Sequence, residues 1–512
     1  MKTLIAVLAL ALAVPALAQE VVELRLPNSS KVVVKLMFRN GSICDPQGKE
    51  GLTFLTANLV AQGGTAEMTF AEIQDAIYPM APAYYVTVDK EVTVFTFEVH
   101  RDWLKEFYPI LRGLILTPSF TEQDFQRVKV NQQAYVDQVI RASSDEEYSK
   151  KALEDLLFRG TNYQHMKEGT SAGVKAITLD DVKAQYAKFF TRANLMIGIA
   201  GGYDDAFLAM LRKDMETLPA ATVPVPKPGA ARMPDGVVVE IVAKDDAFGS
   251  AIFTGVPLNI TRADDEFAAL MVANSYLGEH RKSYSKLYQE IRAARSMNYG
   301  DYSYIEWYEG GGGNMLPPPG VPRTSNYFAI WIRPVQIAAQ LHQQYPELAD
   351  VPIGHAHFAL RMAFHELNEL VTKGMTEEQF EATRAFLESY IKLYVQTPAD
   401  RLGYLMDSQF YGRKDYIKEL GALLAGLTLE DVNRAIKNHW STQNMFVTIV
   451  TNTSEAEPLA ESLRKNTPSP MSYSDLVKAG LPEDVLAKDD VVAKMPLNVT
   501  SVTIVPSAET FR

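Results

Sequence analysis

The stretch Gly51-Leu-Thr-Phe-Leu-Thr-Ala-Asn-Leu-Val-Ala-Gln-Gly-Gly-Thr65 carries the apolar spacing of a helix. Four apolar side chains recur there on one helix face: Leu52, Leu55, Leu59 and Val60. Gly63 and Gly64 follow, and glycine accepts the left-handed conformation that often ends a helix. The stretch therefore predicts a helix from Leu52 to the glycine pair, preceded by a turn-rich loop at residues 39–51.

This helix and the loop before it resemble the zinc-binding segment of the M16 (insulinase/pitrilysin-like) peptidases. In that family the helix carries the inverted motif His-x-x-Glu-His. The matching positions here are Phe54, Ala57 and Asn58, and the first histidine of the whole chain is His100. Phenylalanine and alanine have no donor atom for zinc, and a neutral asparagine is a poor ligand. The resemblance therefore implies an M16 fold that lacks the zinc motif.

The family's third zinc ligand is a glutamate on a later helix. The matching segment here, residues 125–135, contains no acidic residue. Both histidines, the general-base glutamate and the third ligand are therefore missing. We expect no cofactor in this chain and no peptidase activity from this chain alone.

Two short motifs recur in the same order and at nearly equal offsets, which indicates a tandem duplication. The first pair is Phe120-Thr-Glu-Gln-Asp-Phe125 and Met375-Thr-Glu-Glu-Gln-Phe380. The second pair is Ile177-Thr-Leu-Asp-Asp-Val182 and Leu427-Thr-Leu-Glu-Asp-Val432. An asparagine and an apolar strand follow both copies of the second motif at identical spacing. Thr178 and Thr428 each precede an acid by three residues, which predicts a helix N-cap box in each copy.

Each copy mixes alternating strands with helices, which favours the α+β class with sheets rich in antiparallel strands. We expect strands at 31–38, 92–99 and 237–242 and a helix at 103–116. The resemblance implies two tandem homologous M16-like domains. Family members build a clam-like chamber from four such domains, so this chain would supply half of one.

We divide the chain into five parts. These are a signal peptide at 1–18, an N-terminal M16-like domain at 19–217, a linker at 218–236, a C-terminal M16-like domain at 237–469 and a C-terminal extension at 470–512. Five prolines make the linker extended and stiff. Within the extension, residues 499–505 have the pattern of an added strand.

The first residues have the features of a secretory signal. Lys2 is followed by a short apolar run, and Ala16-Leu17-Ala18 is typical of a cleavage site. The run is too short to cross a bilayer comfortably, so we expect no membrane span. We expect cleavage near Ala18 and export to the periplasm or the medium.

Composition excludes several classes of partner. The formal net charge is −12, which argues against a general nucleic-acid or anionic-membrane binder. Cys44 is the one cysteine, so no intramolecular disulfide can form. We expect Cys44 to be a small buried residue.

The stretch Leu287-Tyr-Gln-Glu-Ile-Arg-Ala-Ala-Arg-Ser-Met-Asn-Tyr299 resembles a second signature of the family. There an arginine and a tyrosine seven residues later contact the bound peptide and its reacting carbonyl. The matching positions are Arg292 and Tyr299, whose side chains can both donate hydrogen bonds. Ser296 stands where the family usually has glycine. The alternative is that Arg292 is a solvated helix residue and Tyr299 a half-buried strand residue.

Other residues imitate metal sites or loops. Tyr276-x-x-Glu279-His280 resembles the inverted motif, but Gly278 within it indicates a helix end. His355, His357 and His365 leave two readings open: a metal site completed from elsewhere, or polar positions around an amphipathic helix at 358–371. The glycine- and proline-rich stretch at 309–320 is either a gating loop or a surface loop.

Three functions are compatible with these features of the sequence. The first is a non-catalytic subunit that pairs with an M16 chain bearing an intact zinc motif, or with a second copy of itself, and contributes Arg292 and Tyr299 to binding peptide substrates. The second is a peptide-binding or assembly module without proteolysis. The third is a hydrolase that uses a different site, near His357 or His365.

Overall fold

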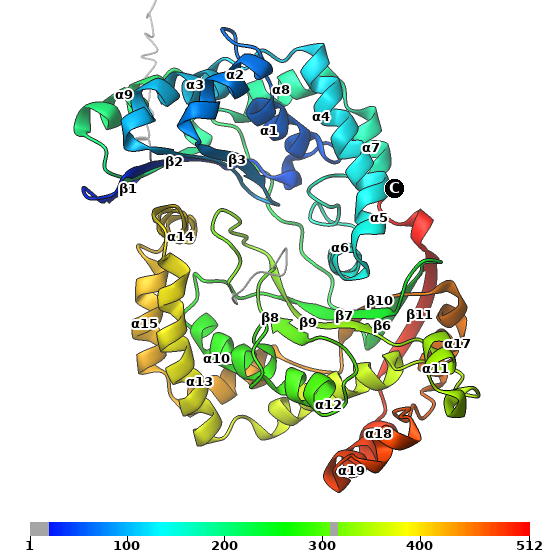
Figure 1. Cartoon of the computed structure of the whole chain (residues 1–512). Coiled ribbons are helices and arrows are strands. Elements are labelled where there is room, and N and C mark those ends of the chain that lie inside the picture. The colour runs from blue at the N-terminus through cyan, green and yellow to red at the C-terminus, as the bar shows by residue number, and fades with distance from the viewer. Residues whose placement is uncertain (1–19, 308–315) are drawn as a thin grey trace, which may run out of the picture.

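The computed structural model describes residues 20–307 and 316–512, without the side chain of Ser143. The expected signal peptide and residues 309–315 of the glycine-rich stretch lie outside the described residues. Two β-sheets face each other, and each has helices on its outer face (Figure 1). No helix in the described ranges is long and apolar enough to cross a membrane.

The first sheet has five strands in the order β1–β5–β2–β4–β3. They are β1 (Glu20–Arg25), β2 (Lys31–Phe38), β3 (Ala83–Val88), β4 (Thr93–His100) and β5 (Leu195–Gly201). β1 is parallel to β5, and the other neighbours are antiparallel. The helices that pack on its outer face are α1 (Leu52–Gln62), α2 (Phe70–Ile77), α3 (Leu104–Leu116), α8 (Leu179–Phe189) and α9 (Asp205–Met215).

The second sheet has six strands in the order β11–β6–β10–β7–β9–β8. They are β6 (Val237–Ala243), β7 (Ser250–Leu258), β8 (Asp301–Tyr304), β9 (Asn326–Val335), β10 (Met445–Thr451) and β11 (Val499–Pro506). The helices beside it include α10 (Glu266–Gly278), α11 (Ala338–Gln344), α12 (Ala356–Lys373), α13 (Glu377–Tyr390), α15 (Tyr416–Gly426), α16 (Leu429–His439) and α17 (Thr453–Lys465). The expected strands and helices therefore begin and end within one or two residues of the observed ones.

The two sheets confirm the duplication. Without β11, the second sheet repeats the strand order of the first, with β6 in the place of β1 and β8 in the place of β3. The repeated motifs begin equivalent helices. Thr121 caps α4 (Glu122–Ala134) as Thr376 caps α13, and Thr178 caps α8 as Thr428 caps α16.

The halves are joined by an exchange of helices. α6 (Asp145–Leu157), from the first half, packs on the inner face of the second sheet against Phe253, Trp331 and Phe446. α14 (Pro398–Phe410), from the second half, packs on the inner face of the first sheet against Val33, Met37 and Met196. Figure 1 shows both helices between the sheets. Each half thus supplies apolar cover that the other half needs.

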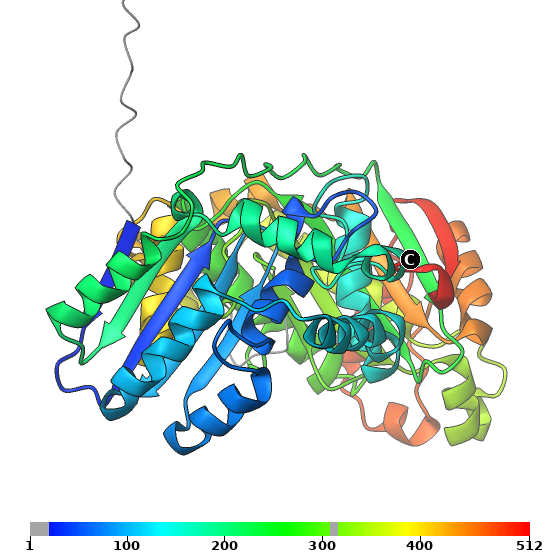
Figure 2. The same ribbon diagram turned by 90° about the horizontal axis from the view of Figure 1, so that it is seen from above.

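The remaining segments connect these layers. The π-helix η4 (Tyr135–Val139) continues from α4 into α5 (Ile140–Ser143), and α7 (Ser171–Ala176) follows α6. The proline-rich segment between α9 and β6 has no helix or strand and crosses from one half to the other (Figure 2). Asn162 of the first half holds it, because its Nδ2 donates to the Lys227 oxygen at 3.0 Å and its Oδ1 accepts from the Gly229 nitrogen at 2.8 Å.

The C-terminal extension is part of the fold. It forms α18 (Asp475–Ala479), α19 (Glu483–Val492) and β11, which adds to β6 in parallel. The strand expected at 499–505 is therefore confirmed. The last residues return to the first half, where Phe511 packs in a cluster with Tyr148.

Candidate functional site

The N-terminus of α1 is fixed by a buried carboxylate. Asp45 Oδ1 accepts a hydrogen bond from the Thr53 nitrogen and Oδ2 accepts one from the Gly51 nitrogen, both at 2.7 Å. His165 Nε2 also lies 3.1 Å from Oδ2. Gly51 has φ +101°, and a Cβ there would lie 2.7 Å from the Glu168 carbonyl oxygen. Glycine is therefore required where the loop enters the helix.

The end of α1 differs from the expectation. Gly63 has φ −97° and ψ −179°, which is extended backbone, so the predicted left-handed cap is wrong. Close approach explains the glycines instead. A Cβ on Gly63 would lie 2.5 Å from the Leu59 oxygen, and one on Gly64 would lie 2.8 Å from the Met68 oxygen.

The three positions that match the family's zinc motif make structural contacts. Phe54 is half-buried against the core of the first half, and Ala57 is buried in that core. Asn58 Nδ2 donates to the Phe54 oxygen at 2.9 Å, and its Oδ1 accepts from Gln62 Nε2 at 3.0 Å. The amide of Asn58 is therefore used along its own helix.

The segment expected to hold the third ligand also has a packing role. Gln132 on α4 is buried, and its Nε2 donates to the Gly51 oxygen at 3.0 Å and the Glu168 oxygen at 2.8 Å. Across residues 20–307 and 316–512, no group of three or more His, Cys, Asp and Glu side chains could hold a metal ion. The residues present at this site do not fit zinc.

Arg292 and Tyr299 lie together in the second half. The π-helix η6 (Tyr288–Ala293) carries Arg292, whose guanidinium carbon is 4.7 Å from the Tyr288 ring centroid and 5.7 Å from that of Tyr299. Tyr299 is 77% exposed. Tyr299 precedes β8 and is not the half-buried strand residue of the alternative reading.

The turn between Arg292 and Tyr299 contains Ser296, which stands where the family usually has glycine. Ser296 has φ +53°, in the left-handed region that favours glycine. Asn298 then fixes the turn, since its Nδ2 donates to Asp301 Oδ1 at 2.7 Å and to the Arg333 oxygen at 2.9 Å. Ser296 thus adopts a backbone conformation that favours glycine. The hydrogen bonds of Asn298 hold the chain next to Tyr299 in place.

Comparisons with family models identify the chain. The model described as "Insulinase (Peptidase family M16)" matches residues 20–171, and the model "Peptidase M16 inactive domain" matches residues 176–318. The chain belongs to the M16 peptidase family. The second match begins in the first half of this M16 chain and continues through the linker into the second half.

Two curated proteins are similar to this M16 chain. A "Non-peptidase homolog" of Helicobacter pylori is 22% identical over 425 residues, which cover 82% of this chain and 88% of that protein. An "Uncharacterized zinc protease" of Streptomyces coelicolor is 22% identical over 279 residues, or 53% of each chain. Together with the unsuitable donor set in α1 and α4, the first comparison supports an inactive M16 homologue.

Solved structures share the fold. A "peptidase M16 inactive domain" from Pseudomonas fluorescens has a TM-score of 0.70 at 18% identity, covering 85% of this chain and 96% of that one. A protease from Helicobacter pylori has a TM-score of 0.68 at 14% identity, covering 84% and 96%. A chain of Complex III2 from Candida albicans has a TM-score of 0.64 at 14% identity, covering 84% and 93%.

Of the three histidines near the start and middle of α12, His355 and His357 are buried and His365 is half-buried. His357 is 0% exposed and its Nδ1 contacts Ser462 Oγ at 2.9 Å, while His355 Nε2 contacts the Ser472 oxygen at 3.1 Å. Burial lowers their pKa values, to about 3 for His357 and about 4 for His355. His365 contacts its neighbour Glu366 at 3.1 Å. Leu360, Phe364, Leu367 and Leu370 of α12 face the core as expected, whereas His357 is buried as well and does not lie on a polar face.

The stretch Tyr276-x-x-Glu279-His280, which resembles the inverted zinc motif, also has a structural role. Gly278 is the last residue of α10, as expected. Glu279 is fully buried, which raises the pKa of its carboxyl to about 7, and His280 Nδ1 contacts the Tyr304 hydroxyl. Cys44 is buried too, and burial raises the pKa of its thiol to about 12.

Sequence reasoning missed a buried ionic seam between the halves. Arg323 Nε and Nη2 donate to both oxygens of Asp89 at 2.6 and 2.7 Å, and Lys90 Nζ lies 2.9 Å from Glu154 Oε1. Burial favours the neutral Glu154, but Lys90 and Arg323 outweigh it and lower the pKa to about 2. Charged residues within apolar stretches could have indicated buried charges. Their pairing could not be predicted, because the partners lie on distant segments of the chain.

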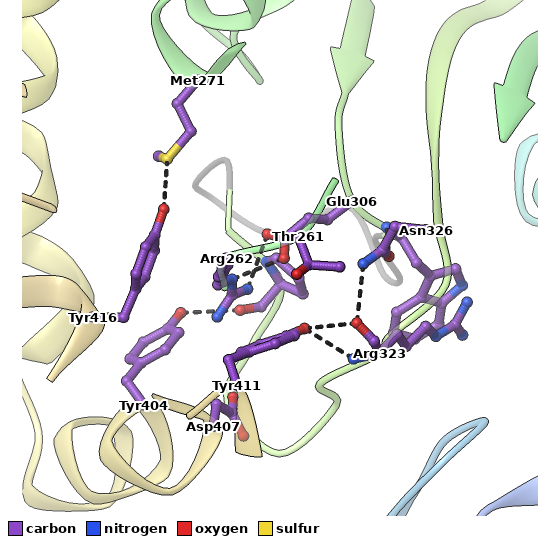
Figure 3. Close-up of polar contacts among 12 residues, drawn as sticks. Thr261, Arg262, Met271, Glu306, Arg323, Asn326, Tyr404, Asp407, Tyr411 and Tyr416 are labelled. Carbon is purple, nitrogen blue, oxygen red and sulfur yellow. Dashed lines mark hydrogen bonds and ion pairs between the residues drawn. The ribbon is translucent and has the colours of Figure 1, made fainter. Parts of the chain in front are cut away.

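Figure 3 shows how this seam continues in the second half. Arg262 Nε donates to Glu306 Oε1 at 2.8 Å, and both side chains are 4% exposed. The Tyr411 hydroxyl donates to the Arg323 oxygen at 3.0 Å and accepts from its nitrogen at 2.9 Å. Tyr411 at the end of α14 is thereby held to Arg323, which itself binds Asp89 of the first half, and the satisfied, buried character of these contacts indicates a structural role.

Proposed function

We propose that this protein is the non-catalytic subunit of a zinc-dependent M16-type peptidase. It pairs with a separate chain that carries an intact His-x-x-Glu-His motif, and it contributes Arg292 and Tyr299 to a substrate chamber that the two chains share. The zinc, its water and the general-base glutamate belong to the partner. This chain holds no metal of its own.

The Arg292–Tyr299 pair carries the proposal, with Tyr299 exposed and Arg292 half-buried. The Arg292 guanidinium lies near the rings of Tyr288 and Tyr299, and no described residue forms an ion pair with it. The Tyr299 side chain is largely open to solvent. Both groups are therefore available to a peptide carbonyl, and both can stabilise negative charge that develops on it.

The first residues support a place outside the cytoplasm. We propose that the signal peptide is removed near Ala18 and that the subunit works in the periplasm or the medium.

A peptide-binding or assembly module without proteolysis is the second candidate. One observation favours it: β3 forms an edge of the first sheet, and Tyr85 on this strand is 51% exposed. An edge strand can bind an extended peptide through its unpaired backbone groups. In this case the isolated chain binds peptides, and a chelator leaves the affinity unchanged.

Substitutions at the pair test the proposal in the native assembly. Arg292→Ala removes a donor to the developing charge, so the rate of peptide cleavage should fall about 100-fold. Tyr299→Phe removes one hydroxyl and should reduce the rate about tenfold. The measurement is steady-state cleavage of a fluorogenic peptide by the assembly purified with each variant.

Two exposed residues of the first half serve as matched controls. Tyr78 is 86% exposed, and Arg192 is exposed. Tyr78→Phe and Arg192→Ala should leave the rate unchanged. If Arg292→Ala and Tyr299→Phe also leave it unchanged, the peptidase-subunit proposal is wrong.

A further inference from the structure

The segment that carries Arg292 is flanked by charged residues bound to the C-terminal extension. Arg295 Nε donates to Asp489 Oδ1 on α19 at 2.7 Å, and its Nη1 donates to the Glu290 carbonyl oxygen at 2.5 Å. The Arg295 side chain is fully buried. Lys488 Nζ, also on α19, lies 2.9 Å from Glu290 Oε1. The extension therefore contacts the chain on both sides of Arg292, at Glu290 and at Arg295.

The same contacts reach the core helix α12. Lys488 Nζ lies 2.5 Å from Glu366 Oε1, and Lys286 lies 2.7 Å from Glu290 Oε1 and 3.7 Å from Glu366 Oε2. Three cations and three anions thus form one connected set of ion pairs: Lys286, Arg295 and Lys488 with Glu290, Glu366 and Asp489. Burial opposes ionisation of Glu290, but Lys286 and Lys488 outweigh it and lower the pKa to about 2.

The extension has an independent anchor. Arg361 on α12 is fully buried and donates to the Ala493 and Met495 carbonyl oxygens, each at 2.8 Å. Tyr473 within the extension donates to Asp489 Oδ2 at 2.7 Å. The extension should therefore stay in place when a single contact between α19 and η6 is removed.

We infer that the C-terminal extension positions the substrate-binding pair, with Asp489 and Lys488 acting through Arg295 and Glu290 on Arg292 and Tyr299. This inference rests on the proposed function for its consequence in binding, but the positioning itself is a property of the isolated chain. Asp489 and Lys488 are positioning residues, since neither contacts Arg292 or Tyr299.

The physical reason is the geometry of the segment. A π-helix and the left-handed Ser296 are both sparsely populated backbone conformations, so the surrounding structure must hold them in place. Arg295 lies between them, and its bonds to Asp489 and Glu290 are contacts that can do so. When Asp489 loses its charge, the buried guanidinium keeps only Glu290 as an ionic partner, and the segment from Tyr288 to Tyr299 should open more often.

Asp489→Asn tests the inference, with Asp490→Asn as its matched control. Asp490 is the next residue on α19, is exposed and forms no ion pair within the described ranges. Hydrogen exchange of the isolated full chain should become about tenfold faster at residues 288–299 in Asp489→Asn. The KM of the native assembly for a fluorogenic peptide should rise about tenfold while kcat stays within about twofold. Asp490→Asn should change neither quantity.

Further variants separate positioning from general stability. Asp489→Glu keeps the carboxylate, so its KM should lie close to that of the native assembly. If Asp489→Asn does not fold, Lys488→Met takes its place, because Lys286 remains near Glu290. Unchanged exchange at 288–299 in Asp489→Asn would overturn the inference. If exchange rises but Arg292→Ala leaves KM and kcat unaltered, positioning stands and the peptidase-subunit proposal fails.

Discussion

At the residue scale, Asp407 should make the stability of the fold depend on pH. Its carboxyl lies on α14 at the seam between the halves, is 2% exposed and accepts hydrogen bonds from the Gly320 nitrogen at 3.0 and 3.2 Å. Burial raises its pKa to about 7, and the charge of Arg262 opposes this only in part. In the unfolded chain the carboxyl has its ordinary low pKa. The folded protein therefore holds a proton that the unfolded chain has lost between pH 4 and pH 7, and its free energy of unfolding should fall as pH rises through this window.

Asp407→Asn should remove this contribution. The amide oxygen can still accept from the Gly320 nitrogen, and it has no charge to bury. The free energy of unfolding of the variant minus that of the native protein should be about 2–4 kcal/mol larger at pH 8 than at pH 5. Urea unfolding at the two pH values measures the difference, with the exposed Asp350→Asn as a control. Parallel pH profiles for the variant and the native protein would show that the raised pKa is wrong.

At the element scale, helix caps were predictable because they are local. Thr428 accepts from the Asp431 nitrogen at 3.2 Å, and Asp431 Oδ2 accepts from the Thr428 nitrogen at 3.0 Å. The equivalent box at Thr178 has the same form. Hydrophobic spacing placed α1, α3 and α12 for the same reason, since it reflects which face of a single helix is buried.

Thr428→Ala should destabilise the second half. It leaves the first amides of α16 without their side-chain acceptor, which costs about 1 kcal/mol. Thr428→Ser keeps the acceptor and should cost much less. Denaturant unfolding followed by tryptophan fluorescence measures both, because Trp440 directly follows α16 and is buried against Phe328. Equal effects of alanine and serine would contradict the capping role.

Contacts between distant elements were not predictable from local pattern. Asp45 and His165, or Arg323 and Asp89, meet only because the chain folds back over many residues. The glycine pair after α1 predicts a left-handed cap, although Gly63 serves close packing against Leu59. The resemblance to M16 peptidases singled out Arg292 and Tyr299, which lie together in the structure, but it gave no sign that α19 holds their segment.

At the scale of the whole molecule, the exchange of α6 and α14 makes the halves depend on each other. The inner face of the first sheet buries Val33, Met37 and Val94 against Leu402 and Met406 of α14. An isolated N-terminal domain, residues 19–217, lacks that cover and should expose a large apolar surface. It should bind a hydrophobic dye and aggregate. Adding residues 218–512 in trans should suppress both effects, whereas a soluble monomer without dye binding would contradict the exchange.

In the proposed assembly this M16 chain supplies substrate contacts and a partner supplies the zinc. A tagged pull-down from the native compartment tests it most directly, with bound zinc counted and peptide cleavage assayed in the same eluate. We expect a stoichiometric second chain, zinc in proportion to that chain, and cleavage that a chelator abolishes. A protein that elutes alone, metal-free and inactive would contradict the claim and favour the peptide-binding or assembly role.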